Sequence, residues 1–179
     1  MQWFPAGSAL PLAALGAALA PVAAQARIYV SVEQAQREMF GALALTPHPV
    51  ALTAAQQEVL RAASSVSLPF QGNRIWKTAD GSWFVVDEVV GKHEFVTYAV
   101  GINADGSVRR VEVLEYRESY GYEVAEQKWL AQFVGKTVEA PLQLGRDVQN
   151  IGGATLSAKH VADGVKRVLA AYRLVLQAR

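Results

Sequence analysis

The 179-residue sequence contains no cysteine, and its charges almost cancel, with 17 Lys and Arg against 16 Asp and Glu. Without cysteine there are no disulfides, thiol nucleophiles or cysteine-ligated metals. Only 14 glycines and 7 prolines occur, which excludes a collagen-like chain. A net charge of +1 gives no electrostatic reason to expect a nucleic acid partner. Apolar residues, by contrast, make up 51% of the chain, enough for one folded domain at this length.

The first 26 residues carry no charged side chain. Residues 9–20 are almost entirely Ala and Leu, and Ala24-Gln25-Ala26 then matches the small-x-small pattern of a signal peptidase site. The apolar run is shorter than the roughly 20 residues of a transmembrane helix. We therefore predict a signal peptide over 1–26 and a single exported, periplasmic or otherwise extracytoplasmic domain over 27–179. An uncleaved N-terminal anchor is the alternative, because no Lys or Arg precedes the apolar run.

The part after residue 26 predicts an α+β fold, an antiparallel meander with flanking helices and a long C-terminal helix. Apolar residues at helical spacing predict helices over residues 32–40, 54–63, 122–134 and 155–177. Alternating Val, Phe and Tyr predict consecutive strands over residues 74–78, 82–90, 94–103 and 107–117. Residues 41–52 and 136–153 are predicted to be loops.

Individual residues refine this prediction. Ser31 and Thr53 are predicted N-caps, with Gln34 completing a capping box with Ser31. The pair Arg109-Arg110 interrupts the strand alternation and predicts a bulge. On the last helix, a buried stripe is predicted for Val161, Val165, Val168, Tyr172 and Val175, and a solvated face for Lys159, Lys166 and Arg167.

The candidate binding sequence is IGGATLS at residues 151–157. Gly152 and Gly153 permit close approach of the backbone to a ligand, and the helix that follows offers free N–H groups and the positive end of its dipole. Thr155 and Ser157 add hydroxyl donors in its first turn. These features suit a phosphate, although a plain Gly-Gly loop followed by a threonine N-cap has the same sequence.

The triplet Gly153-Ala154-Thr155 at the start of a C-terminal helix resembles the FMN-binding domain family. Members of this family include flavoprotein components of the sodium-translocating NADH:quinone reductase and of the Rnf complex, and small stand-alone periplasmic proteins. The family pattern is Asp-x-x-Ser/Thr-Gly-Ala-Thr. The resemblance implies FMN as cofactor, joined through its phosphate to the Thr155 hydroxyl by a flavin transferase. Two positions differ, because Gly152 stands in the Ser/Thr place and Gln149 in the Asp place.

A second segment, residues 101–124, looks like the core hairpin of the family followed by its Glu-x-x-Gly turn. Glu118 and Gly121 match that turn, whereas Tyr120 stands where the respiratory members have proline. The resemblance implies that the turn lies near the flavin, with Glu118 bonding a ring N–H or the ribityl chain and Tyr120 offering a surface for the ring. From the residues alone, a capping glutamate and a tyrosine packed on the sheet edge remain open.

The resemblance implies an extracytoplasmic flavoprotein that carries electrons between a membrane-bound reductase, quinone or haem protein and an acceptor, while itself peripheral to the membrane. It favours a carrier or accessory subunit over a stand-alone enzyme, and the sequence has no Rossmann fingerprint for NAD(P)H. No metal site is predicted. The alternative is a flavin-free binding or scaffold module on the same fold. The predicted cofactor-binding residues are Gly152, Gly153, Ala154, Thr155, Ser157, Glu118, Tyr120 and Gly121, with His160 either assisting the phosphate or lying on the surface.

Overall fold

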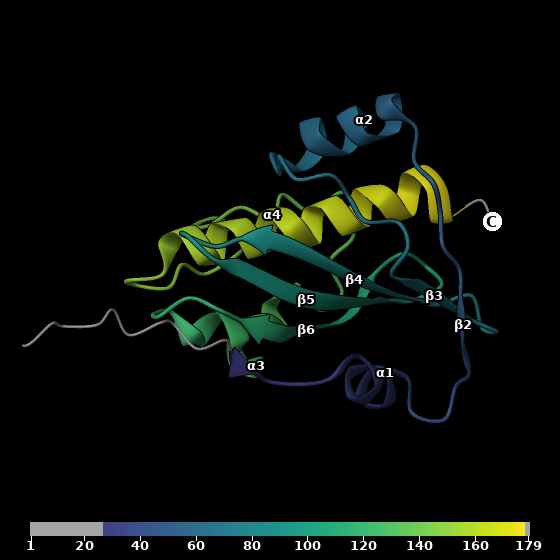
Figure 1. The fold of residues 1–179 in the computed structure, drawn as a ribbon, viewed down its shortest axis with the longest axis horizontal. Coiled ribbons are helices and arrows are strands. Elements are labelled where there is room, and N and C mark those ends of the chain that lie inside the picture. The colour runs from purple at the N-terminus through teal and green to yellow at the C-terminus, as the bar shows by residue number, and fades with distance from the viewer. Residues whose placement is uncertain (1–26, 178–179) are drawn as a thin grey trace, which may run out of the picture.

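The computed structural model describes residues 27–177, in which six antiparallel strands form one sheet with helices on both faces (Figure 1). The strand order is β1-β6-β5-β4-β3-β2. The predicted meander consists of β3 (Ile75–Thr78), β4 (Trp83–Val90), β5 (Phe95–Ile102) and β6 (Val108–Tyr116). Two short strands flank it, β1 (Arg27–Ile28) beside β6 and β2 (Leu45–Pro47) beside β3. The predicted α+β class is confirmed, whereas the predicted signal peptide lies outside the described residues.

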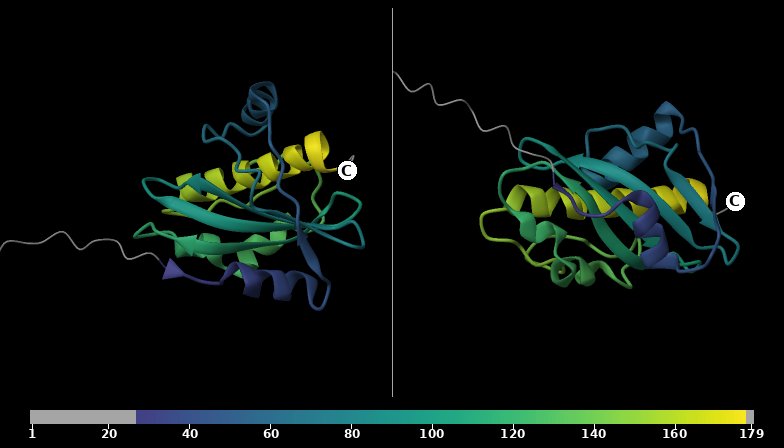
Figure 2. Two further views of the ribbon diagram at one scale, coloured as in Figure 1. Left: turned by 45° about the vertical axis from the view of Figure 1, so that its right-hand side comes forward. Right: turned by 60° about the horizontal axis from the view of Figure 1, so that its bottom comes forward.

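The helices lie in layers on the two faces of the sheet (Figure 2). The long helix α4 (Thr155–Ala171) runs along one face, and α2 (Ala54–Ser64) packs on the outer side of α4. Helix α1 (Val32–Phe40) covers the opposite face. Shorter helical segments are η1 (Tyr122–Ala125), α3 (Gln127–Leu130), η2 (Ala131–Phe133) and η3 (Tyr172–Leu176), the last being a π-helical turn that extends α4. Among residues 27–177, no helix is both long and apolar enough to cross a membrane.

Successive side chains along each strand point to opposite faces of the sheet, so the sheet has a hydrophobic core on each face. On β4, Val85 and Val89 belong to the core under α4, while Phe84 and Val86 belong to the core under α1. Each buried side chain of this size contributes about 1.5–3 kcal/mol. The stripe predicted on the last helix is buried as expected, at Val161, Val165, Val168, Tyr172 and Val175.

Three local predictions need correction. Strand β2 lies within the segment 41–52 that was expected to be a loop, and Pro47 is tolerated there because an edge strand needs no outward N–H. The helix expected over 122–134 is interrupted, since Glu126 has an extended backbone (φ −74°, ψ 131°). The Gln34 side chain donates to Glu38 at 2.8 Å instead of completing a capping box.

The predicted bulge is confirmed at Arg109. Gly101 of β5 pairs with Arg110, and its neighbour Ile102 pairs with Val108, so Arg109 is the extra residue of β6. A bulge of this kind bends the strand and increases its twist.

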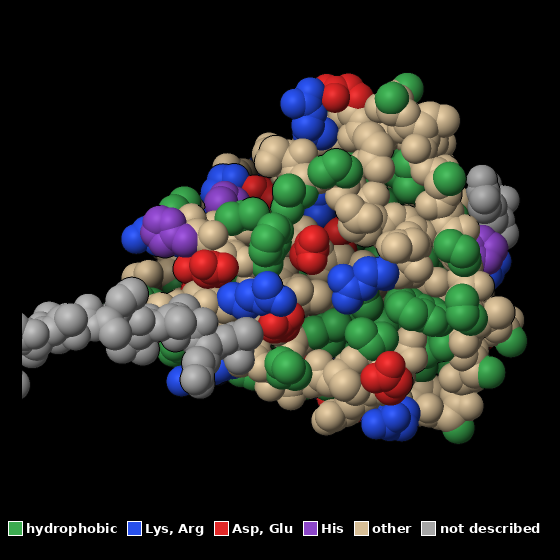
Figure 3. Space-filling view, viewed as in Figure 1, with side chains coloured by type: hydrophobic (Ala, Val, Ile, Leu, Met, Phe, Trp, Pro, Cys, Tyr) green, Lys and Arg blue, Asp and Glu red, His purple; other side chains and the backbone are tan. Residues whose placement is uncertain are grey.

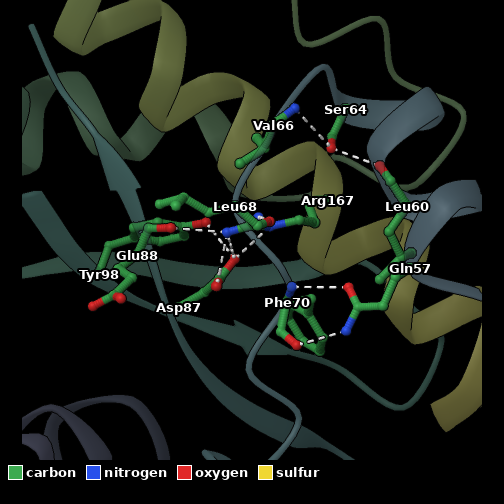
Figure 4. A network of polar contacts seen from close by, with 10 residues as sticks. All are labelled: Gln57, Leu60, Ser64, Val66, Leu68, Phe70, Asp87, Glu88, Tyr98 and Arg167. Atoms are coloured by element: carbon green, nitrogen blue, oxygen red, sulfur yellow. Dashed lines mark hydrogen bonds and ion pairs between the residues drawn. The ribbon is translucent and has the colours of Figure 1, made fainter. Parts of the chain in front are cut away.

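Arg167 was expected on the solvated face of the last helix, but its side chain is only 1% exposed. Its guanidinium donates to both carboxylate oxygens of Asp87 at 2.9 Å, and to the carbonyl oxygens of Leu68 (2.6 Å) and Glu88 (2.8 Å) (Figure 4). The Tyr98 hydroxyl donates to Asp87 at 2.8 Å. Because every partner is supplied, the buried charge is satisfied, and the network ties α4 to β4 and to the segment after α2.

A close approach at Gly164 completes the docking of α4 on the sheet. A Cβ at this position would lie 2.2 Å from the Tyr98 hydroxyl, so only glycine lets the helix come this near. The helix that carries Thr155 is therefore fixed against the sheet by packing and by charge.

Candidate functional site

A cavity of about 520 Å³ opens where α4 begins. Figure 1 shows this start of α4 at the left end of the view. Its walls come from the turn between β4 and β5, the turn after β6, and the first turn of α4. Six of the eight predicted cofactor-binding residues line it, namely Glu118, Tyr120, Gly153, Ala154, Thr155 and Ser157. The remaining lining residues are Lys92, His93, Ser119 and Leu156.

Thr155 is the first residue of α4, and it is exposed. The N-cap is Ala154, and no side chain caps the helix, so the alternative that Thr155 is itself the N-cap is wrong. The Thr155 Oγ1 accepts a hydrogen bond from Asn150 Nδ2 at 3.2 Å. The start of α4 thus offers an accessible hydroxyl beside N–H groups that no side chain occupies.

Ser157 also lines the cavity, but its side chain is tied inward. It is 4% exposed, and its Oγ lies 3.2 Å from the hydroxyl of Tyr116. Burial raises the pKa of Tyr116, so its hydroxyl stays protonated and donates to the Tyr120 carbonyl oxygen at 2.5 Å. Of the two hydroxyls expected at the site, only that of Thr155 is accessible.

The two predicted residues that do not line the cavity are glycines. Gly121 has φ +83°, and a Cβ there would lie 2.4 Å from the Cβ of Ala154. Gly121 therefore contributes indirectly to the site, because its lack of a side chain lets the turn after β6 contact the start of α4. Gly152 is exposed, with nothing within 4 Å of the position its Cβ would take.

Glu118 is only 8% exposed, and it holds the turn between β4 and β5. Its Oε1 accepts hydrogen bonds from the backbone N–H groups of Lys92, His93 (2.5 Å) and Glu94 (3.0 Å). Burial acts to raise the pKa of Glu118, but these N–H donors outweigh it, so the pKa lies below its usual value. The carboxylate is ionised and caps the turn, while its contact with a flavin stays a prediction.

His160 lies outside the cavity lining. Its Nδ1 is 2.7 Å from the carbonyl oxygens of both Val90 and Gly91. Because carbonyl oxygens only accept, this nitrogen carries the proton and donates. His160 therefore fastens the end of β4 to α4, and the interpretation that it assists the phosphate finds no support in its position.

Sequence reasoning missed Lys92 and His93. Residues 91–93 fall between two predicted strands, and nothing in the sequence shows that this segment reaches a helix that begins at residue 155. Two adjacent basic residues after Gly91 were the available signal, because glycine permits a close approach. A Cβ at Gly91 would lie 2.7 Å from Glu118 Oε1 and 3.1 Å from Ser157 Oγ.

Together, the fold and the cavity define an α+β domain with a pocket suited to an anionic cofactor. Residues 91–170 match the model of the FMN-binding domain. The chain is therefore similar to the FMN-binding domain family over residues 91–170, and the matched segment contains every residue that lines the cavity. FMN is the cofactor that this assignment supports. No curated protein matches the chain.

The cavity fits FMN in size and chemistry. Its volume of about 520 Å³ lies within the range of roughly 300–1,000 Å³ that is usual for ligand pockets. Tyr120 and Leu156 are 81% and 45% exposed at its rim, and they provide apolar surface for a flavin ring. Thr155, Lys92 and His93 provide a hydroxyl and basic groups for a phosphate.

Proposed function

We propose that this protein is an extracytoplasmic electron carrier that holds FMN in the cavity at the start of α4, with Thr155 as the attachment residue. The observation that carries the proposal is the exposed Thr155 hydroxyl, which lines a cavity of suitable size within the segment that matches the FMN-binding domain. The uncharged, Ala-rich residues 1–26 support export. FMN supplies the redox chemistry, since a flavin accepts two electrons and can release them one at a time.

Thr155 Oγ1 is the proposed attachment atom. A flavin transferase would form the bond between this oxygen and the FMN phosphorus, break the bond to the leaving group of a phosphoanhydride FMN donor, and remove the hydroxyl proton. Asn150 donates to Oγ1, so it orients the oxygen without using its proton. Ser157 is unsuited to this role because its side chain is buried against Tyr116.

A covalent bond would keep the cofactor in a compartment that does not make FMN. Attachment through the phosphate leaves the ring free, and the exposed Tyr120 and Leu156 leave the rim of the cavity accessible. The proposed redox partners are a membrane-bound reductase, a quinone or a haem protein.

A flavin-free binding module is the second candidate, and the residues at 149 and 152 favour it. The family aspartate is replaced by Gln149, and the nearby Asp147 cannot substitute for it. The Asp147 carboxylate accepts from Lys136 Nζ at 2.9 Å and from the Gln143 N–H at 2.8 Å, which holds it inside its own loop.

In-gel fluorescence tests the proposal. The full chain is exported from cells that also make a flavin transferase, then denatured, separated and illuminated with ultraviolet light. We expect a fluorescent band that is absent from Thr155→Ala and unchanged in the control Thr46→Ala, an exposed threonine of β2. Because Thr155 is not the N-cap, its replacement should cost less than the ~1 kcal/mol of a lost cap.

Two outcomes would contradict parts of the proposal. A dark band from yellow native protein would mean FMN without a covalent bond, and colourless protein would favour the flavin-free module. The double variant Gln149→Asp/Gly152→Thr restores the family pattern, and the open space around Gly152 accommodates the new side chain. If only this variant carried flavin, Gln149 and Gly152 would be the reason that the native chain carries none.

A further inference from the structure

The turn between β4 and β5, residues 91–94, brings two basic side chains to the cavity. Lys92 and His93 are both exposed and both line the cavity. They are the two basic side chains among its lining residues, and Glu118 is the acidic one. Figure 3 shows Lys or Arg and His side chains, with Asp or Glu side chains beside them, at the end of the molecule where β4 and β5 meet.

The backbone of this turn is held from two sides. Glu118, from the segment after β6, accepts the N–H groups of residues 92–94. His160, from α4, donates to the carbonyl oxygens of residues 90 and 91. The turn also closes on itself through the Gly91 N–H, which donates to the Glu94 carbonyl oxygen at 2.7 Å. Because these N–H and carbonyl groups already have partners within the protein, a ligand would contact the turn through its side chains.

Glu118 is ionised, and the backbone dipoles of the turn partly screen its negative charge from a ligand. Three N–H dipoles point at its Oε1, and these donors hold its pKa below the usual value. The negative charge is therefore solvated by the protein itself. Two basic side chains and the uncapped start of α4 are left facing the cavity, and an anion fits this lining.

We propose that Lys92 and His93 bind the phosphate of FMN, and that Glu118 and His160 act through the turn as positioning residues. The proposal rests on the proposed function. The phosphate is favoured over the ring because the turn adjoins the first turn of α4, where a Cβ at Gly91 would lie 3.1 Å from Ser157 Oγ. Thr155, the proposed attachment residue, lies in that same helical turn.

The test compares free FMN with riboflavin, which has the same ring and no phosphate. Both are titrated into the full chain, made in cells without a flavin transferase, and binding is followed by quenching of flavin fluorescence. We expect Lys92→Gln/His93→Gln to bind FMN about ten- to thirtyfold more weakly, as for the loss of charge-assisted hydrogen bonds, with riboflavin binding unchanged. The control Lys128→Gln/Arg146→Gln removes two exposed charges outside the cavity and should change neither.

An equal loss of affinity for FMN and riboflavin would assign the two residues to the ring and overturn the proposal, as would no loss for either ligand. If the native chain binds both ligands with the same affinity, the phosphate site is absent while the flavin site remains. If it binds neither ligand, the inference fails, while the in-gel fluorescence of chain made with a flavin transferase still tests the proposed function separately.

A thermodynamic cycle tests the positioning role of Glu118. Glu118→Ala should weaken FMN binding relative to riboflavin, and adding it to Lys92→Gln/His93→Gln should have little further effect, because all three residues act through one turn. Glu118→Gln keeps an acceptor oxygen and should recover part of the loss. The positioning role of Glu118 would be overturned if the losses of FMN affinity were additive and Glu118→Gln recovered none of the loss.

Discussion

Gly121 illustrates how much of the site depends on the backbone conformation of one residue. Its φ of +83° belongs to the left-handed region, and its missing side chain lets the turn after β6 touch Ala154. Gly135 has a similar φ of +78°, but nothing lies within 4 Å of the position its Cβ would take. Both glycines therefore need a left-handed backbone conformation, but only Gly121 also lies in close contact with another residue, Ala154.

This pair gives a matched prediction. Gly135→Ala should cost about 1–2 kcal/mol, the penalty of a left-handed L-residue. Gly121→Ala should cost about 1–3 kcal/mol more, because the added methyl overlaps Ala154. Urea denaturation of both variants measures the difference in the free energy of unfolding. Equal costs would show that the close approach to Ala154 contributes nothing to stability.

Sequence reasoning located two walls of the cavity, the start of α4 and the turn after β6, and missed the third, the turn between β4 and β5. Thr155 and Gly153 could be found because they lie in a short continuous pattern at a helix start. The roles of Lys92 and Glu118 could not, since they depend on contact between residues such as His93 and Glu118, which are 25 positions apart. A short sequence pattern identifies residues that lie next to one another in the chain. A contact between residues far apart in the chain forms only when the protein folds.

At the scale of elements, α4 carries Thr155, the proposed attachment residue, at its start and a buried ion pair further along. Arg167 was expected to be solvated because a charged residue on a helix usually faces water. Its partner Asp87 lies 80 residues earlier, in the middle of a strand whose other residues, apart from Glu88, are apolar. That acidic residue within the apolar run of β4 was the signal in the sequence that a buried cation would be needed.

Removal of Arg167 should therefore be costly. Arg167→Met leaves Asp87 buried without its cation, and we expect a loss of about 3–5 kcal/mol in the free energy of unfolding. The matched control is Arg61→Met, which breaks the exposed ion pair with Glu58 and should cost less than ~1 kcal/mol. If Arg167→Met does not fold, Arg167→Lys keeps the charge, loses the two-pronged contact and should show an intermediate loss. Equal values for Arg167→Met and Arg61→Met would contradict the role of the network.

At the scale of the whole molecule, the cavity joins three segments that are distant in sequence, the residues near 92, 119 and 155. A ligand that contacts all three favours the folded state over the unfolded chain. Free FMN should therefore stabilise the Thr155→Ala chain by about 2.7 kcal/mol at one hundred times its dissociation constant. Thermal melts over a range of FMN concentrations measure this, with AMP as a phosphate-bearing control that lacks the ring. A melting temperature independent of FMN would contradict the shared cavity.

The order of elements along the chain was predictable to a large extent. The meander and the long last helix have clear periodicity, which arises from burial of one face of each element. Strands β1 and β2 were not predicted, because segments of two and three residues are too short to show any period. They were recognisable only once β6 and β3 were in place to pair with them.

These two short strands have a consequence for self-association. Strand β2, which contains Pro47, pairs along β3, while the outer edge of β6 pairs with β1 at one end and with the backbone of Gly135 and Lys136 at the other. A long strand with free N–H and carbonyl groups would invite strand addition from a second molecule. Strands β1 and β2, together with Gly135 and Lys136, therefore limit edge-to-edge aggregation of a protein whose sheet would otherwise end in exposed strands.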